Sequence, residues 1–114
     1  MIRIPVADSY SYKKYGADWV NLDPPRHFYL HTTKSIRHLA EVAGLELKET
    51  IYDSDKIQFY GSELYKRNLT LVDYDKGMHK DVFSKKQMHA FKAEVKKLNK
   101  QNEGDWACFY LYKP

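Results

Sequence analysis

The sequence predicts a small α/β domain with about three strands, two main helices and a C-terminal strand in the middle of the sheet. The chain has 114 residues, which suits one domain with one core. Hydrophobic residues make up 43% and charged residues 30%, as in an ordinary globular protein. Alternating apolar residues near both ends predict strands, and two stretches with apolar residues three and four positions apart predict helices.

The first predicted strand covers residues 1–7, where apolar and other residues alternate. Pro5 lacks a backbone donor, which indicates a strand end or an edge strand. Residues 8–32 are rich in tyrosine and turn residues and are predicted to be a long irregular connection. Pro24 and Pro25 should hold its middle extended. Connections of this length are usually functional loops.

The first helix is predicted to begin at Thr33, as its cap, and to end before Gly44. Its apolar stripe consists of Ile36, Leu39, Ala40 and Ala43. Residues 45–60 alternate again and predict one long strand, or two strands separated by residues 53–55. Gly61 and Ser62 are expected to stop this strand and to start one helical turn through Glu63, Leu64 and Tyr65.

The second half ends in a helix and a strand. Residues 66–80 show no dependable periodicity and are predicted to be a loop, after which Ser84 can cap the second helix. The apolar stripe of that helix is Met88, Phe91, Val95 and Leu98, and the lysines outside it are Lys85, Lys86, Lys92, Lys96, Lys97 and Lys100. In residues 106–113 both alternating sets are largely apolar, so this strand should be covered on both faces.

Composition limits the cellular compartment and the kinds of partner that can be expected. The formal net charge of +4 and the pI near 9.0 permit contact with nucleic acid without demanding it. The single cysteine, Cys108, cannot form an intramolecular disulfide and is predicted to be a small buried residue, which favours a reducing cytoplasm. No stretch has the length and hydrophobicity of a membrane span, so no membrane contact is expected.

Familiar catalytic and metal-binding motifs are absent from the sequence. The five glycines stand too far apart for a phosphate-binding loop, and no G-x-S-x-G turn occurs. His27 and His31 have helical metal-ligand spacing, but the prolines upstream favour extended chain, so no metal is expected. His27, next to Arg26, is the most interesting titratable group on the long connection.

Two alternative classes of function stay open at this point. The lysine-rich second helix could follow phosphates, and aromatic residues of the long connection could stack on bases; these are Tyr10, Tyr12, Tyr15 and Trp19. A solvated helix face and loop-packing tyrosines are the preferred interpretation, so nucleic acid is not the expected partner. The other alternative is a structural or interaction domain that pairs through an edge strand.

The phrases IRIPVADSYSYKKYGADWVNLDPPRHFYLHTTKSIRHLAEVAGL and CFYLY resemble the C-terminal half of class I S-adenosylmethionine-dependent methyltransferases, in particular a bacterial group with a D-x-P-R-H loop. The resemblance implies that residues 1–7, 45–60 and 106–113 are the fifth, sixth and seventh strands, and that residues 34–43 are the helix after the fifth. The seventh strand would lie antiparallel between the other two. The whole chain would be one domain, a three-layer remnant of a doubly wound sheet.

The same resemblance implies a function and its limits. The complete enzyme would use S-adenosylmethionine to methylate a small or saccharide-like acceptor. Its glycine-rich loop and ribose-binding carboxylate would precede Met1, so no cofactor site and no independent activity are expected of this chain. The loop after the fifth strand would border the substrate, which makes Asp8, Arg26, His27 and Tyr29 substrate-side candidates. A missing N-terminal half or a second copy would pair with the first strand.

Overall fold

A three-stranded antiparallel sheet organises the molecule. The computed structural model describes residues 1–23, 26–27 and 29–114. The strands are β1 (Ile2–Pro5), β2 (Glu46–Tyr52) and β3 (Trp106–Tyr112), in the order β1–β3–β2. Both pairs are antiparallel, so β1 and β2 run parallel to each other on either side of β3. The predicted α/β class and the central antiparallel C-terminal strand are confirmed.

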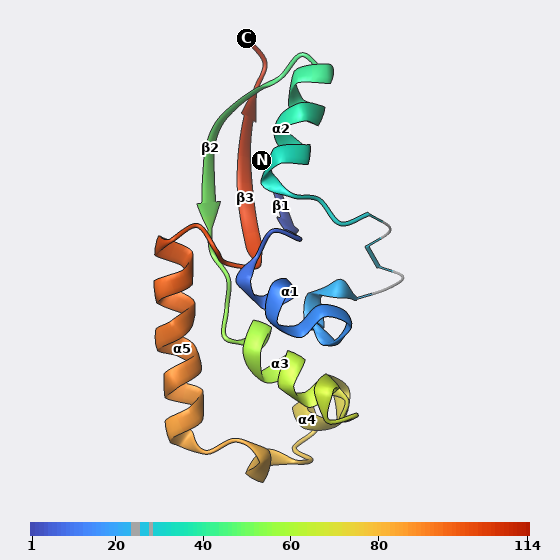
Figure 1. Ribbon diagram of the computed structural model, residues 1–114, viewed down its shortest axis with the longest axis vertical. Coiled ribbons are helices and arrows are strands. Elements are labelled where there is room, and N and C mark those ends of the chain that lie inside the picture. The colour runs from blue at the N-terminus through green and yellow to red at the C-terminus, as the bar shows by residue number, and fades with distance from the viewer. Residues whose placement is uncertain (24–25, 28) are drawn as a thin grey trace.

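The molecule is elongated and measures 51 × 29 × 23 Å, with the sheet at one end and most of the helices at the other (Figure 1). The helices are α1 (Tyr10–Tyr15), α2 (Thr33–Val42), α3 (Ile57–Lys66), α4 (Leu71–Asp75) and α5 (Lys85–Lys100), with short 3-10 turns η1 (Gly16–Asp18), η2 (Val20–Leu22) and η3 (Lys80–Val82). In Figure 1, α2 lies beside the sheet, whereas α1, α3 and α4 lie beyond the other end of the strands. No helix within the described ranges is long and apolar enough to cross a membrane.

Local side-chain caps begin the two predicted helices. Thr32, one residue before the predicted cap, accepts a hydrogen bond of 3.0 Å from the Ser35 amide, and the Ser35 hydroxyl accepts one from the Thr32 amide. Ser84 caps α5 as predicted and exchanges the same pair of bonds with Gln87. After α2, Gly44 has a φ of +70°, which other residues rarely adopt.

The predicted strand over residues 45–60 is wrong beyond Tyr52, because residues 57–66 form α3. Gly61, expected to stop a strand, lies inside this helix, where a Cβ would approach Val20 Cγ2 to 2.8 Å. A short apolar run fits a buried strand and a buried helix equally well, and packing against η2 decides for the helix.

Two predicted loops also contain helices. The long connection folds into α1, where Ser9 accepts a bond from the Tyr12 amide at 3.3 Å, followed by two 3-10 turns. Residues 66–80 contain α4, which Thr70 caps through the Asp73 amide at 3.1 Å. Each helix is too short to show clear periodicity in the sequence. The prediction for Pro24 and Pro25 lies outside the described residues.

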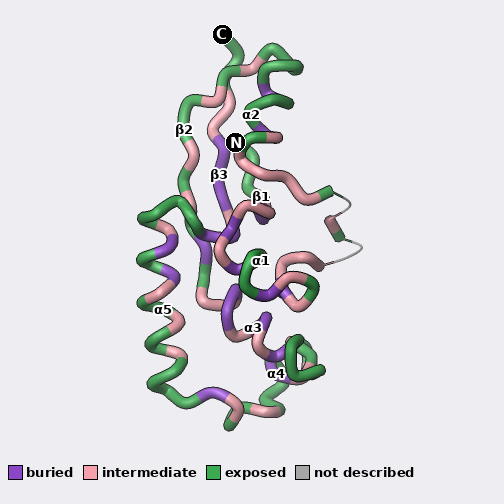
Figure 2. Tube along the Cα trace, in the orientation of Figure 1, coloured by how far each residue is buried: buried purple, intermediate pink, exposed green. Residues whose placement is uncertain are grey.

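Buried residues lie both along the sheet and at the helical end of the molecule (Figure 2), and their side chains form three clusters. The first, between α2 and the sheet, contains Val6, Ile36, Ala107 and Phe109; the second, among α1, α3 and α5, contains Tyr15, Trp19, Phe59, Val95 and Leu98; the third contains Leu64, Tyr74 and Phe83. Tyr15 and Trp19 therefore pack inside the protein and are not platforms for stacking bases. β3 is predicted from its sequence to be buried on both faces. This is true of its first half, where Ala107, Cys108 and Phe109 are buried, but not of its end, where Tyr112 is 54% exposed.

Candidate functional site

The candidate site lies where the sheet meets the helical end of the molecule. The C-terminal ends of β1 and β2 and the N-terminal end of β3 share this edge because β3 runs opposite to its neighbours. In open α/β sheets, ligands bind at the carboxyl ends of parallel strands. The connection after β1 folds over this edge through α1, η1 and η2 (Figure 1).

Asp105, immediately before β3, is the buried polar centre of this region and is fully inaccessible to solvent. Its Oδ2 accepts hydrogen bonds from Trp19 Nε1 at 3.0 Å and from Asn21 Nδ2 at 2.6 Å. Its Oδ1 has no hydrogen-bond partner among the described residues. Burial raises the pKa of Asp105, and the bonds from Trp19 and Asn21 only partly oppose this rise. The carboxylate therefore holds η1 and η2 against the sheet.

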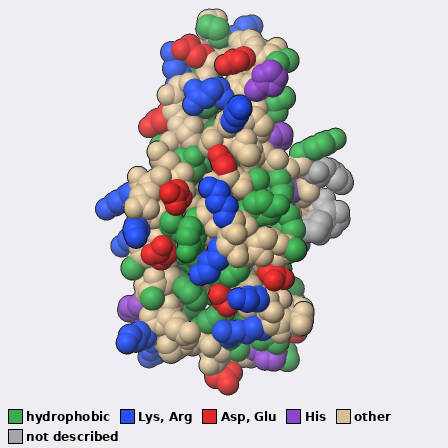
Figure 3. All heavy atoms as spheres, in the orientation of Figure 1, with side chains coloured by type: hydrophobic (Ala, Val, Ile, Leu, Met, Phe, Trp, Pro, Cys, Tyr) green, Lys and Arg blue, Asp and Glu red, His purple; other side chains and the backbone are tan. Residues whose placement is uncertain are grey.

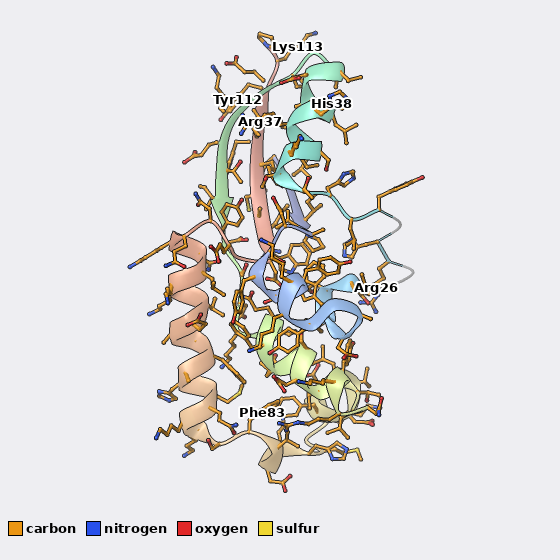
Figure 4. The ribbon with its side chains drawn as sticks, viewed as in Figure 1. Arg26, Arg37, His38, Phe83, Tyr112 and Lys113 are labelled. Atoms are coloured by element: carbon orange, nitrogen blue, oxygen red, sulfur yellow. The ribbon has the colours of Figure 1, made fainter. Side chains whose placement is uncertain are left out.

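A cavity of about 600 Å³ opens beside the start of β3, and it is in the size range of small-molecule sites. It is lined by Val20, Asn21, Asp23, Arg26, His27, Ile57, Tyr65, Leu71, Val72, Asp75 and Trp106. The His27 ring meets the Trp106 indole edge-on, with centroids 6.2 Å apart. Arg26 forms an ion pair of 3.6 Å with Asp23 and stays largely exposed. Figure 4 shows Arg26 at the outer margin, on the connection between α1 and α2.

Arg3 holds the indole of Trp106 in place. Its guanidinium carbon lies 4.5 Å from the Trp106 ring centroid, and its Nε donates to Asp53 Oδ2 at 2.8 Å. The Cys108 thiol also donates to Asp53, at 3.6 Å, and burial together with this carboxylate raises the pKa of Cys108. The thiol is therefore a poor nucleophile, and the prediction of a small buried residue is confirmed.

The structure brings together two of the four substrate-side candidates. Arg26 and His27 line the cavity, whereas Asp8 and Tyr29 do not. Asp8 Oδ2 accepts bonds from the Thr33 amide and hydroxyl, at 3.2 and 2.6 Å, and so anchors the start of α2. Tyr29 is 82% exposed.

The histidine pair does not form a metal site in the described structure. The His31 carbonyl accepts a bond from the Ala7 amide, and its ring contacts the Ser35 hydroxyl at 3.3 Å. His27 instead contacts Trp106. No group of three metal-ligating side chains occurs among the residues that the structure describes.

Sequence reasoning missed Asp105, which accepts a hydrogen bond from Asn21 of the cavity wall without lining the cavity itself, and it missed Asn21 and Asp23, which do line it. Asp105 follows Gly104 and precedes an apolar strand, so it looks like an ordinary turn residue. Asn21 and Asp23 lie among many polar residues of the long connection. The site is recognised only from the burial of Asp105 and from the contact between His27 and Trp106. Both observations depend on segments that are far apart in the sequence.

The described residues do not fit S-adenosylmethionine. The polar side chains that follow β1 already have partners: the Ser9 hydroxyl caps α1, and the Asp8 carboxylate is bonded to Thr33. The three glycines with positive φ are Gly16, Gly44 and Gly77, which are separate in the sequence and form no phosphate-approaching loop.

Comparison of the chain with protein-family models, with curated proteins and with solved structures finds no match.

Proposed function

We propose that this chain is the substrate-side part of a class I S-adenosylmethionine-dependent methyltransferase domain and is inactive without the cofactor-binding part. The order β1–β3–β2, with β3 antiparallel between two mutually parallel strands, carries this proposal. It is the order of the fifth, seventh and sixth strands in the family that the sequence resembles. The free thiol of Cys108 suits a reducing compartment, so the proposal includes a cytoplasmic location.

The cavity beside Trp106 is the proposed place of the methyl acceptor. The indole offers an apolar face on which the C–H side of a sugar-like ring can pack. Asp23 and Asp75 accept hydrogen bonds, and Arg26 and Asn21 donate them. His27 is the group that can take a proton from an acceptor hydroxyl. These groups favour a small polyhydroxylated acceptor.

The outer edge of β1 is the proposed contact with the rest of the domain or with a second copy. In the described structure this edge pairs with another segment only beyond the strand, at the bridge between Val6 and His31. Next to it is an apolar cavity of about 350 Å³. It is lined by Ile2, Ile4, His31, Ile36, Leu39, Ala40, Ala43, Leu45 and Leu111. An unpaired edge beside apolar surface invites strand addition.

Calorimetric titration with S-adenosylhomocysteine tests the proposed function. We expect no binding by the chain alone, and binding near 1 µM, about −8 kcal/mol, by a longer protein in which this chain is joined to the cofactor-binding half of such a domain. In that longer protein, His27→Ala should leave this affinity unchanged and abolish methyl transfer. Micromolar binding by the chain alone would contradict the proposal, as would a longer protein of this kind that binds no S-adenosylhomocysteine.

A further inference from the structure

A second concave surface lies on α5 and shares no lining residue with the cavity beside Trp106. We call it the lysine groove; it has a volume of about 660 Å³ and is lined by Lys56, Phe83, Lys85, Met88, His89, Lys92, Ala93 and Lys96. Figure 4 shows Phe83 where η3 meets α5, far from Arg26. The groove is therefore a separate candidate site, and its interpretation does not rest on the proposed methyltransferase function.

The lysines of this groove converge from two elements. Lys85, Lys92 and Lys96 are seven and four residues apart and so occupy one side of α5. Lys56 reaches the groove from just before α3. Figure 3 shows Lys and Arg side chains along the margin that α5 forms.

The positive charge of the groove is not neutralised within the described structure. None of its described lining residues is acidic, and no ion pair between described residues involves any of the four lysines. A concave surface lined by one sign of charge focuses the field and concentrates ions of the opposite sign. The groove is thus suited to an anionic partner.

The length of the charged row and its chemistry indicate the kind of anion. Lys85 and Lys96 are eleven residues apart, which is about 16 Å along a helix, so one small anion cannot contact both. Lysine ammonium groups only donate hydrogen bonds. A phosphodiester backbone presents only acceptors, whereas a peptide strand also brings N–H donors, for which these lysines provide no acceptor.

We propose that the lysine groove binds the sugar-phosphate backbone of nucleic acid without sequence preference. Phe83, the aromatic residue of the groove, is 6% exposed and lies beneath the Arg67 guanidinium, so it offers no platform for a base. Binding through backbone phosphates alone should depend steeply on salt. Sequence reasoning favoured a solvated lysine face because it could not bring Lys56 opposite α5.

Two triple variants of one helix test this proposal. Lys85→Gln/Lys92→Gln/Lys96→Gln removes the α5 charges of the groove, and Lys86→Gln/Lys97→Gln/Lys100→Gln removes the same number from the rest of α5. Starting from +4, each variant has a formal net charge of 4 − 3 = +1. A difference in affinity between the two variants therefore reports the position of the lysines and not the net charge of the protein.

Fluorescence anisotropy with a labelled oligouridine of about 12 nucleotides, in a salt series, is the measurement. We expect the groove variant to lose about tenfold or more in affinity. The slope of log affinity against log salt concentration should fall by about 2, because each of the three lost phosphate contacts contributes roughly 0.7. The control variant should change the affinity less than about threefold. Circular dichroism should show equal helix content in both variants.

Equal losses in the two variants would overturn the proposal, since they would reflect net charge alone. Absence of oligouridine binding by the unmodified chain at about 50 mM salt would also overturn it. Lys56→Gln adds an independent check, because it leaves α5 intact. It should lower the salt slope by about 0.7, and an unchanged slope would remove Lys56 from the site.

Discussion

The indole nitrogen of Trp19 donates a hydrogen bond of 3.0 Å to the carboxylate of Asp105, and both side chains are buried. The two residues are 86 positions apart in the chain. The Asp105 carbonyl also accepts a bond of 2.9 Å from the Val6 amide. Asp105 thus joins the end of β1, the start of β3 and the turns that border the candidate site.

The Asp105 carboxyl should make stability depend on pH. Its pKa is raised above 3.8 by burial, so the folded protein retains a proton that the unfolded chain releases. This contribution to the free energy of unfolding is complete below pH 3.8 and is lost as the pH rises through the folded-state pKa. Asp105→Asn cannot titrate. Urea unfolding over a pH series should show that the wild type loses stability relative to this variant as pH increases; a constant difference would mean that the pKa is not raised.

Trp19→Phe should destabilise the fold through the lost donor as well as through lost packing. We expect a cost of about 2–4 kcal/mol, because a buried carboxyl oxygen would be left short of one bond. In the Asp105→Ala background, where no side-chain oxygen accepts the bond, the cost should be about 1 kcal/mol smaller. Denaturant unfolding of the two single variants and the double variant measures this coupling, and strictly additive losses would argue against the bond.

Gly61→Ala should be destabilising although alanine favours helices. Its Cβ would lie 2.8 Å from Val20 Cγ2, and overpacking of this kind costs about 1–3 kcal/mol against a gain of about 1 kcal/mol in helix propensity. Val20→Ala removes the contact with Cγ2 and leaves only the milder one with the Cβ of residue 20, at 3.1 Å, so the loss caused by Gly61→Ala should be smaller in that background. Thermal unfolding checks this, and a loss of equal size in both backgrounds would contradict the packing explanation.

The outer edge of β1 should mediate self-association of the chain when no other partner is present. Ile2→Lys should abolish it, because it places a charge on the edge strand beside the apolar cavity. Ile51→Lys is the matched control, since Ile51 is 42% and Ile2 41% exposed and Ile51 lies on β2. Analytical ultracentrifugation is the measurement, and a wild-type chain that stays monomeric at high concentration would refute the prediction.

Prediction from sequence succeeded where one short segment contains its own signal. The Ser84 cap, the apolar stripe of α5 and Gly44 after the end of α2 all act within a few residues, so a linear pattern reveals them. It failed for α3, whose apolar residues suit either periodicity. For the site, it identified Arg26 and His27 but also Asp8, which anchors α2, and Tyr29, which is exposed.

By itself, the sequence determined the α/β class, the two main helices and the central position of the last strand, because hydrophobic periodicity and helix caps are local properties. Only the tertiary structure decided that residues 57–66 are helical, that Asp105 is buried against Trp19, and that Lys56 faces α5. The reason is physical: burial and convergence depend on contacts between segments that are distant in the chain, and no local pattern of residues encodes which segments will meet.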